Sequence, residues 1–191
     1  MIKAIAISGS PRKNGNTEIL LKRVTNALEK SGIETEFVSL AEHTIKSCRA
    51  CGLCRTLGNA TCAITGDDFN GIFKSICKSD IIITGTPVHF GSATPDIMAL
   101  LDRAGYVSRA NSNLLSRKIG GPVTVARRAG QNFTYAQLLY WYMINDMIVP
   151  GSTYWNITFA REAGEVENDK EGIATIDRFA ENLIWLAKKI F

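Results

Sequence analysis

The sequence predicts an α/β domain in which helices cover both faces of a five-stranded parallel sheet. Three observations lead to this prediction. Short apolar runs of strand length alternate along the chain with longer amphipathic runs of helical length. The chain has 191 residues, of which 46% are hydrophobic and 21% charged, enough for one domain with a full core. Strand, glycine-bearing polar loop and helix also follow one another at its start. We therefore expect a single domain over residues 1–191.

The expected elements follow in order along the chain. An apolar run at 2–7 predicts the first strand, and the run from 17 to about 30 predicts the first helix. Residues 34–40 alternate between apolar and polar, as in a half-buried second strand. Residues 80–86 contain three consecutive isoleucines, Ile81–Ile83, and predict an apolar strand that is buried on both faces. The remaining expected elements are a helix at 69–77, a helix at about 94–106, a strand at 122–126, a helix at about 133–146, a strand within 152–159 and a closing helix at 171–191.

Two loops are expected to meet at one edge of this sheet. Five parallel strands joined by right-handed crossovers fit the order 2-1-3-4-5, which places ligands beyond the carboxyl ends of strands one and three. Residues 8–17 leave strand one, and residues 86–92 leave strand three. The second loop carries one imidazole, one aromatic ring and several small residues, so a flat ring system could lie on it.

The composition and position of residues 8–17 predict an anion site. Backbone N–H groups at a helix start point at such a loop, and the helix dipole favours negative charge there. Arg12 adds a forked cation, and further donors are available from Ser8, Ser10, Asn16 and Thr17. We predict that a phosphate binds here. The alternative is a polar turn that binds nothing.

The spacing in this loop narrows the choice of phosphate ligand. Five residues separate Gly9 from Gly15, and Asn16 stands where a Walker A loop has its lysine. The dinucleotide fingerprint G-x-G-x-x-G is absent as well. Many neutral donors with only Arg12 and Lys13 as cations suit one terminal monophosphate better than a metal-bridged triphosphate.

Four of the five cysteines lie in one loop, at about 45–66, with the spacing C-x2-C-x2-C-x7-C. Thiols in the cytoplasm are usually kept reduced, so we expect these cysteines to bind a metal rather than to form disulfides. Structural zinc sites usually pair knuckles from separated segments, whereas three cysteines at this spacing plus a fourth resemble iron–sulfur ligation. An iron–sulfur cluster, zinc and free thiols all stay open at this point. Cys77, in the helix at 69–77, is expected to be a buried apolar cysteine.

The motifs together resemble a known family. Ser8-Gly9-Ser10-Pro11-Arg12 followed by Gly15-Asn16-Thr17 resembles the phosphate loop of the flavodoxin-like FMN reductases. With the compact cysteine loop after strand two, nearly the whole chain resembles the iron–sulfur flavoproteins of anaerobic organisms. The resemblance implies a flavodoxin-like three-layer sandwich, FMN and a [4Fe–4S] cluster. The cluster ligands that it implies are Cys48, Cys51, Cys54 and Cys62.

The resemblance also implies which residues contact the flavin. Relatives place a Thr-Pro-Val-Tyr segment against the isoalloxazine; here Phe90 replaces the tyrosine. The loop after strand four matches their third flavin loop, with Ala129-Gly130 in place of a glycine pair. The expected flavin contacts are Ser8, Ser10, Arg12, Gly15, Asn16, Thr17, Pro87, Val88, His89, Phe90, Gly91, Arg128 and Gly130.

A flavin and a cluster in one chain indicate electron transfer. A cluster passes single electrons and a flavin takes one or two, so the cofactors carry the chemistry and no catalytic side chain is predicted. We expect an FMN-dependent oxidoreductase that takes electrons from ferredoxin. The first alternative is an NAD(P)H-dependent FMN or quinone reductase without a cluster. The second is a zinc-stabilised binding module without redox turnover.

Charge and hydropathy restrict the partners. The net charge of +4 and a pI of about 8.8 come without the dense basic stripe of nucleic-acid-binding domains, so no nucleic acid is expected. No apolar run approaches the ~20 residues of a membrane helix and no signal peptide is seen, so we expect a cytoplasmic protein with no membrane contact. The mid-chain cations are expected to be scattered solvated charges rather than a patch for an acidic partner: Arg103, Arg109, Arg117, Lys118, Arg127 and Arg128.

The helix at about 133–146 carries more aromatic residues than one core face can use. Some of these rings are expected to lie in a subunit interface, although a wholly internal face is the competing interpretation. Because the family that the chain resembles forms dimers and tetramers, we expect a homodimer or homotetramer.

Overall fold

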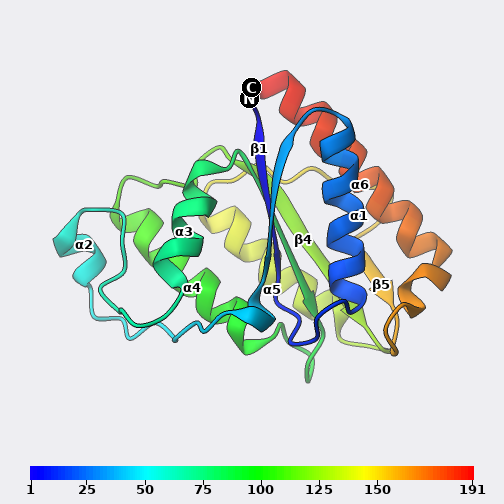
Figure 1. The fold of residues 1–191 in the computed structure, drawn as a ribbon, viewed down its shortest axis with the longest axis horizontal. Coiled ribbons are helices and arrows are strands. Elements are labelled where there is room, and N and C mark those ends of the chain that lie inside the picture. Colours follow the sequence, from blue (N-terminus) through cyan, green and yellow to red (C-terminus); the bar gives the residue numbers. More distant parts are fainter.

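Every strand of the sheet runs parallel to its neighbours, in the order β2-β1-β3-β4-β5 (Figure 1). The computed structural model describes residues 1–191. The predicted strand order is therefore confirmed. The strands are β1 Lys3–Ser8, β2 Glu34–Ser39, β3 Ile81–Pro87, β4 Ile119–Ala126 and β5 Ile157–Phe159.

Helices cover both faces of the sheet, which gives the predicted three layers. On one face lie α1 (Asn16–Lys30) and α6 (Lys170–Ile190), and on the other lie α3 (Phe69–Lys78), α4 (Pro95–Ala110) and α5 (Gln131–Ile144). The two chain ends lie together at one end of the molecule, opposite the carboxyl ends of the strands (Figure 1). The shorter helices are α2 Leu53–Leu57, η1 Leu40–Glu42 and η2 Glu165–Asn168.

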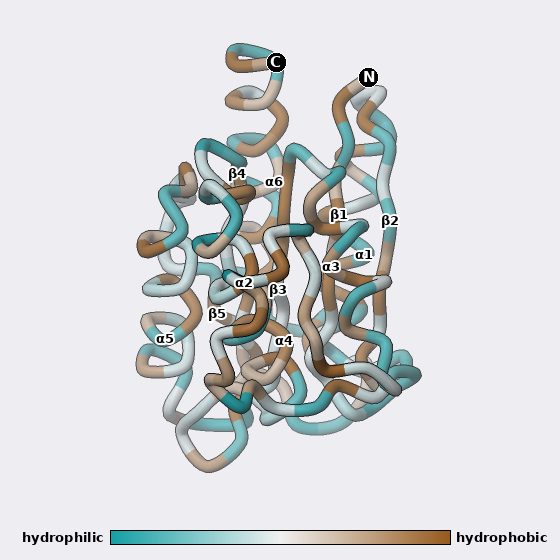
Figure 2. The backbone as a smooth tube through the Cα atoms, turned by 90° about the vertical axis from the view of Figure 1, so that its left-hand side faces the viewer, coloured by the Kyte–Doolittle hydropathy of each residue, from teal (hydrophilic) through white to brown (hydrophobic).

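The core explains which side chains the helices turn inward. Apolar segments run along β1 and β3 in the middle of the molecule (Figure 2), and β3 is buried from Ile81 to Thr86. On α5, Trp141 and Tyr142 are buried, whereas Phe133 and Tyr140 are exposed. The sheet therefore does not use all the rings of α5, as the sequence predicted. None of the helices is both long and apolar enough to cross a membrane.

The observed elements depart from the expected ones at three points. β4 begins at Ile119, three residues before its predicted start, and its first half contains Gly120 and Gly121. A Cβ at Gly120 would lie 1.8 Å from the carbonyl oxygen of Ile82, so only glycine allows β3 and β4 to approach each other this closely. β5 has only three residues and lies within the predicted range 152–159, whereas α4 runs to Ala110, four residues beyond its predicted end. The cysteine loop contains a helix, α2, that was not predicted.

Two of the mid-chain cations are not solvated, which corrects the expectation for them. Arg103 is fully buried, because its guanidinium binds Asp67 and backbone carbonyls of the cysteine loop. Lys118 donates to the carbonyl oxygens of Cys77 and Ser79 at 2.9 and 2.5 Å, and burial lowers its pKa. Cys77 is half-buried against the core, and burial raises the pKa of its thiol. The other four cations are exposed: Arg109, Arg117, Arg127 and Arg128.

Candidate functional site

The phosphate loop joins the end of β1 to the start of α1, with Gly15 as the N-cap of the helix. A buried carboxylate shapes the loop from inside. Glu18 accepts hydrogen bonds from the backbone N–H of Asn14 at 2.8 Å and from Ser39 Oγ at 2.6 Å. The sequence analysis missed this residue, although a glutamate three residues after a helix N-cap is a known capping signal. The first N–H groups of α1 have no partner within the helix and are available to an anion.

Two predicted contacts, Ser8 and Ser10, have their hydroxyls engaged within the loop. Ser8 Oγ is buried and accepts from the N–H of Ser10 at 3.3 Å. Ser10 Oγ accepts from the N–H of Arg12 at 3.1 Å and donates to the Arg12 carbonyl at 3.2 Å. These hydroxyls hold the loop in its curved form.

Asn16 ties the phosphate loop to the segment after β5. Its side-chain amide donates to the Glu162 carbonyl at 2.8 Å and accepts from the N–H groups of Gly164 at 2.9 Å and Val166 at 3.3 Å. The side chain is thus committed to the protein, which leaves the Asn16 backbone N–H, in the first turn of α1, for a ligand.

The two predicted loops meet around one cavity of about 620 Å³ at the carboxyl ends of the strands. Arg12 and Lys13 line it from the phosphate loop, and Arg127 and Arg161 from the loops after β4 and β5. Lys13 also forms an ion pair with Glu42 at 2.6 Å. Arg161 pairs with Glu162 at 3.1 Å, so Arg12 and Arg127 are the two lining cations without an ion pair, and they favour an anion in the cavity. Its other lining residues are Ser10, Pro11, Gly15, Asn16, Thr17, Pro87, Val88, His89, Val125, Ala160, Glu162 and Ala163.

Five predicted contacts do not line this cavity: Ser8, Phe90, Gly91, Arg128 and Gly130. Phe90 is fully exposed at the tip of the loop after β3, and Arg127 rather than Arg128 reaches the cavity wall. Gly91 and Gly130 have positive φ angles, and a Cβ at Gly130 would lie 3.0 Å from Val88 and 3.1 Å from the Cα of Gly91. These two glycines therefore let the second and third loops pack against each other behind the cavity.

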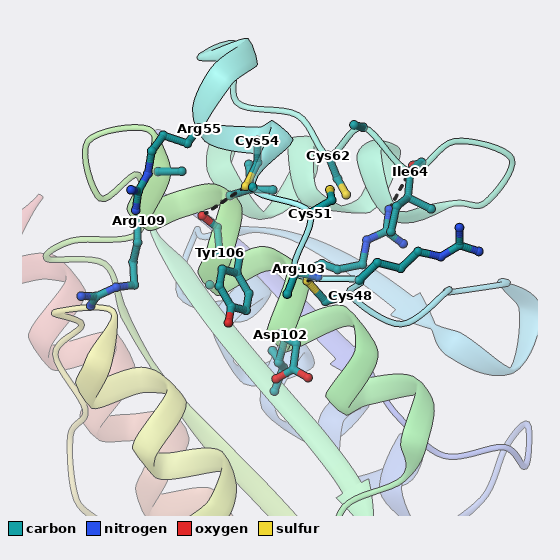
Figure 3. A pocket seen from close by; sticks show the side chains of 18 of the residues that line it. Cys48, Cys51, Cys54, Arg55, Cys62, Ile64, Asp102, Arg103, Tyr106 and Arg109 are labelled. Carbon is teal, nitrogen blue, oxygen red and sulfur yellow. Dashed lines mark hydrogen bonds between the residues drawn. The ribbon is translucent and has the colours of Figure 1, made fainter.

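All four cysteines of the loop line a second cavity, of about 630 Å³, between that loop, α2, α4 and the end of α5 (Figure 3). None of them is in a disulfide, so all four thiols are free. Four thiols around one cavity fit the sulfur ligation of an iron–sulfur cluster or zinc. No group of three or more His, Cys, Asp or Glu side chains converges closely enough here to hold a single metal ion. The four thiols therefore line the same cavity, but they do not converge on one metal position.

Side chains from α3 and the end of α4 hold the cysteine loop in place. Asn70 accepts from the N–H of Cys62 and donates to its carbonyl, both at 2.9 Å. Asn111 donates to the Cys54 carbonyl at 3.3 Å and accepts from the N–H of Ala60 at 3.0 Å. These contacts therefore fix α2 itself and the backbone that follows it.

A buried ion pair lies at the base of the same loop. The guanidinium of Arg103 binds the carboxylate of Asp67, and both side chains have almost no exposure. Burial alone would raise the pKa of Asp67, but Arg103 and the N–H of Lys46 outweigh it and hold that pKa below its ordinary value. The carboxylate therefore stays charged beside Arg103.

The two cavities lie at opposite ends of α4. The helix begins just after the loop that follows β3, while residues from Leu101 to Ala110 line the cysteine cavity. At a rise of 1.5 Å per residue, the ten steps from Pro95 to Gly105 span roughly 15 Å. A ligand in one cavity is therefore well separated from a ligand in the other within the same chain.

Comparison with known proteins assigns the chain to a family. The profile of the family described as "NADPH-dependent FMN reductase" matches residues 2–162. The chain is 35% identical to an iron–sulfur flavoprotein of Methanocaldococcus jannaschii, with 99% of both chains covered. It is 31% identical to the iron–sulfur flavoprotein of Methanosarcina thermophila, with 95% of this chain and 93% of that one covered.

Solved structures agree with the fold. RosB, crystallised with bound 8-demethyl-8-formylriboflavin-5'-phosphate, superposes with a TM-score of 0.73 at 18% identity, covering 100% of this chain and 80% of RosB. A flavodoxin-type WrbA-like protein from Agrobacterium tumefaciens gives 0.64 at 14% identity, with 99% of each chain covered. The flavodoxin-like fold is thus confirmed. By the match over residues 2–162 and its full-length relatives, the chain belongs to the NADPH-dependent FMN reductase family and is a flavin-dependent oxidoreductase.

Proposed function

We propose that the protein is an electron-transfer oxidoreductase that holds FMN in the cavity between the phosphate loop and the loop after β3, and a [4Fe–4S] cluster in the cysteine cavity. The observation that carries this proposal is the presence of both cavities in one chain. One is lined by a helix N-terminus and four cations, and the other by four free thiols. The full-length relatives named as iron–sulfur flavoproteins support it.

The phosphate of FMN would bind at the start of α1. Backbone N–H groups of its first turn donate to the phosphate oxygens, and Arg12 supplies a charged fork beside them. Pro87, Val88 and His89 form the opposite wall, against which the flat ring would lie. The predicted contacts outside the cavity wall, such as Gly91 and Gly130, would act by supporting these loops.

Cys48, Cys51, Cys54 and Cys62 would bind the cluster, which when bound supplies transfer of single electrons. Because this ligation needs reduced thiols, we place the protein in the cytoplasm. The exposed side chains of α5 are the surface that we propose for a second copy of the chain, as a dimer or tetramer: Phe133, Tyr140, Met143 and Ile144. No side chain is proposed as a catalytic acid or base.

The second candidate function is an NAD(P)H-dependent FMN or quinone reductase without a cluster. Two observations favour it: the thiols do not converge on a single metal position, and the matching family is described by its use of NADPH. In this case the cysteines would hold zinc or remain free. A zinc-stabilised module without redox turnover is not proposed, because the chain is a flavin-dependent oxidoreductase.

Anaerobic purification distinguishes these functions. The first proposal expects a brown protein with about one FMN, about four irons and about four acid-labile sulfides per chain, reduced by reduced ferredoxin. A yellow protein without iron that oxidises NADPH would establish the second function instead. Iron without sulfide, or zinc in place of iron, would reject the cluster.

The rim of the cysteine cavity indicates how a donor protein docks. Arg49, Arg55 and Arg109 are exposed there, and none is in an ion pair. Figure 3 shows Arg55 and Arg109 on the side of the cavity where Cys54 lies. Residues 43–66 contain no Asp or Glu, and Asp102 is the single carboxylate outside the buried pair near the rim. We therefore propose that an acidic one-electron donor such as ferredoxin docks on this basic rim.

Charge reversal tests the rim. At low salt, ferredoxin should reduce the Arg55→Glu/Arg109→Glu variant at least about tenfold more slowly than it reduces the wild-type protein. Most of this difference in rate should disappear at high salt. The rate is measured by anaerobic stopped-flow absorbance, with iron and FMN content checked in parallel. Arg178→Glu, on the opposite face of the sheet, is the control and should behave as wild type. Equal rates for both variants and wild type would place the donor elsewhere.

A further inference from the structure

We propose that Arg103 is the positioning residue of the cysteine loop, where it closes the base of the loop and brings the first and last cysteines together before a metal binds. This inference rests on the proposed function, since it concerns how the proposed cluster site is formed. Nothing in the sequence pattern pointed to Arg103, which reads there as one of several surface cations.

The contacts of the guanidinium are specific to the two ends of the loop. Arg103 Nη1 donates to the Lys46 carbonyl at 3.0 Å, and Nη2 donates to the Ile64 carbonyl at 3.1 Å. Lys46 lies two residues before Cys48, and Ile64 lies two residues after Cys62. One side chain from the middle of α4 thus joins the outgoing and returning segments of the loop, two residues from its first and last cysteines.

Asp67 completes this connection. Its carboxylate binds the guanidinium and also accepts from the N–H of Lys46 at 2.9 Å. Lys46 Nζ donates to the Thr65 carbonyl at 3.0 Å, and the Arg103 guanidinium carbon lies 4.0 Å from the centroid of the Phe69 ring. We call this set the loop clasp: Lys46, Ile64, Asp67, Phe69 and Arg103.

The chemistry of the clasp indicates that Arg103 orients the loop rather than only stabilising its packing. A buried ion pair is costly to desolvate, and apolar side chains of similar size would pack α4 against the loop at least as well. Arg103 Nε has no hydrogen-bond partner, so the hydrogen bonds of the guanidinium to the loop come from its two Nη groups. An apolar residue, however, cannot bind the carbonyls of two different loop segments at the same time. Lysine cannot do it in the same geometry, because it lacks the planar fork.

The loop has little else to fix its thiols. Its only helix is the five-residue α2, and Cys51 and most of its neighbours are exposed. Asn70 and Asn111 fix Cys62 and Cys54, but neither contacts the segment that carries Cys48. Groups that orient metal ligands typically change metal affinity 10–100-fold when they are removed. Opening the clasp should therefore weaken cluster assembly without affecting the flavin cavity at the other end of α4.

Two variants separate positioning from general stability. Arg103→Lys keeps the charge and removes the fork, while Arg103→Met/Asp67→Leu replaces the pair by apolar groups and restores packing without an unpaired buried charge. After anaerobic reconstitution with iron and sulfide, both should bind iron with roughly 10–100-fold weaker apparent affinity than wild type. FMN content and, in the double variant, the melting temperature should stay close to wild type. Arg178→Lys, in the exposed pair with Glu181, is the matched control.

A second readout needs no metal. In the metal-free protein, iodoacetamide should alkylate Cys48 and Cys62 several-fold faster in both clasp variants than in wild type, with Cys77 as the internal reference. Iron loading and alkylation equal to wild type in the double variant would overturn the clasp. Failure of the wild-type chain itself to take up iron and sulfide would instead reject the proposed function, and the alkylation rates would still decide for or against the clasp.

Discussion

Replacing Gly15 with aspartate should abolish FMN binding at micromolar concentrations while leaving the free protein folded. Gly15 is the N-cap of α1, with φ −80° and ψ 176°, a conformation that aspartate adopts readily. The new carboxylate would accept from the same N–H groups that the proposed phosphate needs, and it would repel the phosphate. Each lost charge-assisted hydrogen bond costs about 1.5–3 kcal/mol, so the Kd should rise by roughly 100-fold or more.

Flavin fluorescence quenching measures this effect on the free protein. Gly15→Ala is the control for size, because a Cβ there would lie 3.3 Å from the Arg12 carbonyl oxygen, and it should weaken binding far less than the aspartate does. The melting temperature of the free aspartate variant should equal or exceed that of wild type, since aspartate is a better N-cap than the glycine that it replaces. A Kd for FMN within threefold of wild type in the aspartate variant would show that the phosphate binds elsewhere.

Replacing Cys48 and Cys62 with serine should remove iron and sulfide completely and leave about one FMN per chain. These residues are the outermost of the four thiols that line the cysteine cavity. Two missing thiolates leave a site with half of its soft ligands, which is too few for a [4Fe–4S] cluster. The flavin cavity shares no lining residue with this one, so its ligand should be unaffected.

Iron, sulfide and flavin analyses of anaerobically purified protein measure the result. Cys77→Ser is the control, since Cys77 lies on α3 outside the cavity wall and should keep full iron content. Loss of iron in the Cys77 variant, or retention of iron and sulfide in the double variant, would contradict the assignment of the four ligands.

The sheet could be predicted because its signals are local. Apolar runs of strand length and amphipathic runs of helical length are read directly from the chain, and handedness then restricts the strand order. The early start of β4 could not be read in this way. Gly120 and Gly121 have weak strand propensity, and they belong to the strand because they pair with β3, which lies close enough to Gly120 to exclude a side chain there. Tertiary contact decides such positions.

The site was predictable in its location and less so in its side chains. The phosphate loop and the four cysteines carry their chemistry in local spacing. Most of the phosphate loop lines one cavity, and all four cysteines line the other. The partners of individual polar groups depend on distant residues. Asn16 is bound by a segment about 150 residues away, and Arg103 by the base of a loop some 40–60 residues before it. Only the folded chain shows that Asn16 connects two loops and that Arg103 is buried in the loop clasp.

Anomalous diffraction from crystals of the anaerobically purified protein, grown with FMN and recorded at the iron edge, tests the central claim most directly. The account expects iron density in the cavity lined by Cys48, Cys51, Cys54 and Cys62, and a flavin whose phosphate lies on residues 10–17. A flavin bound elsewhere, or an iron-free cavity in protein that is fully loaded with FMN, would contradict it.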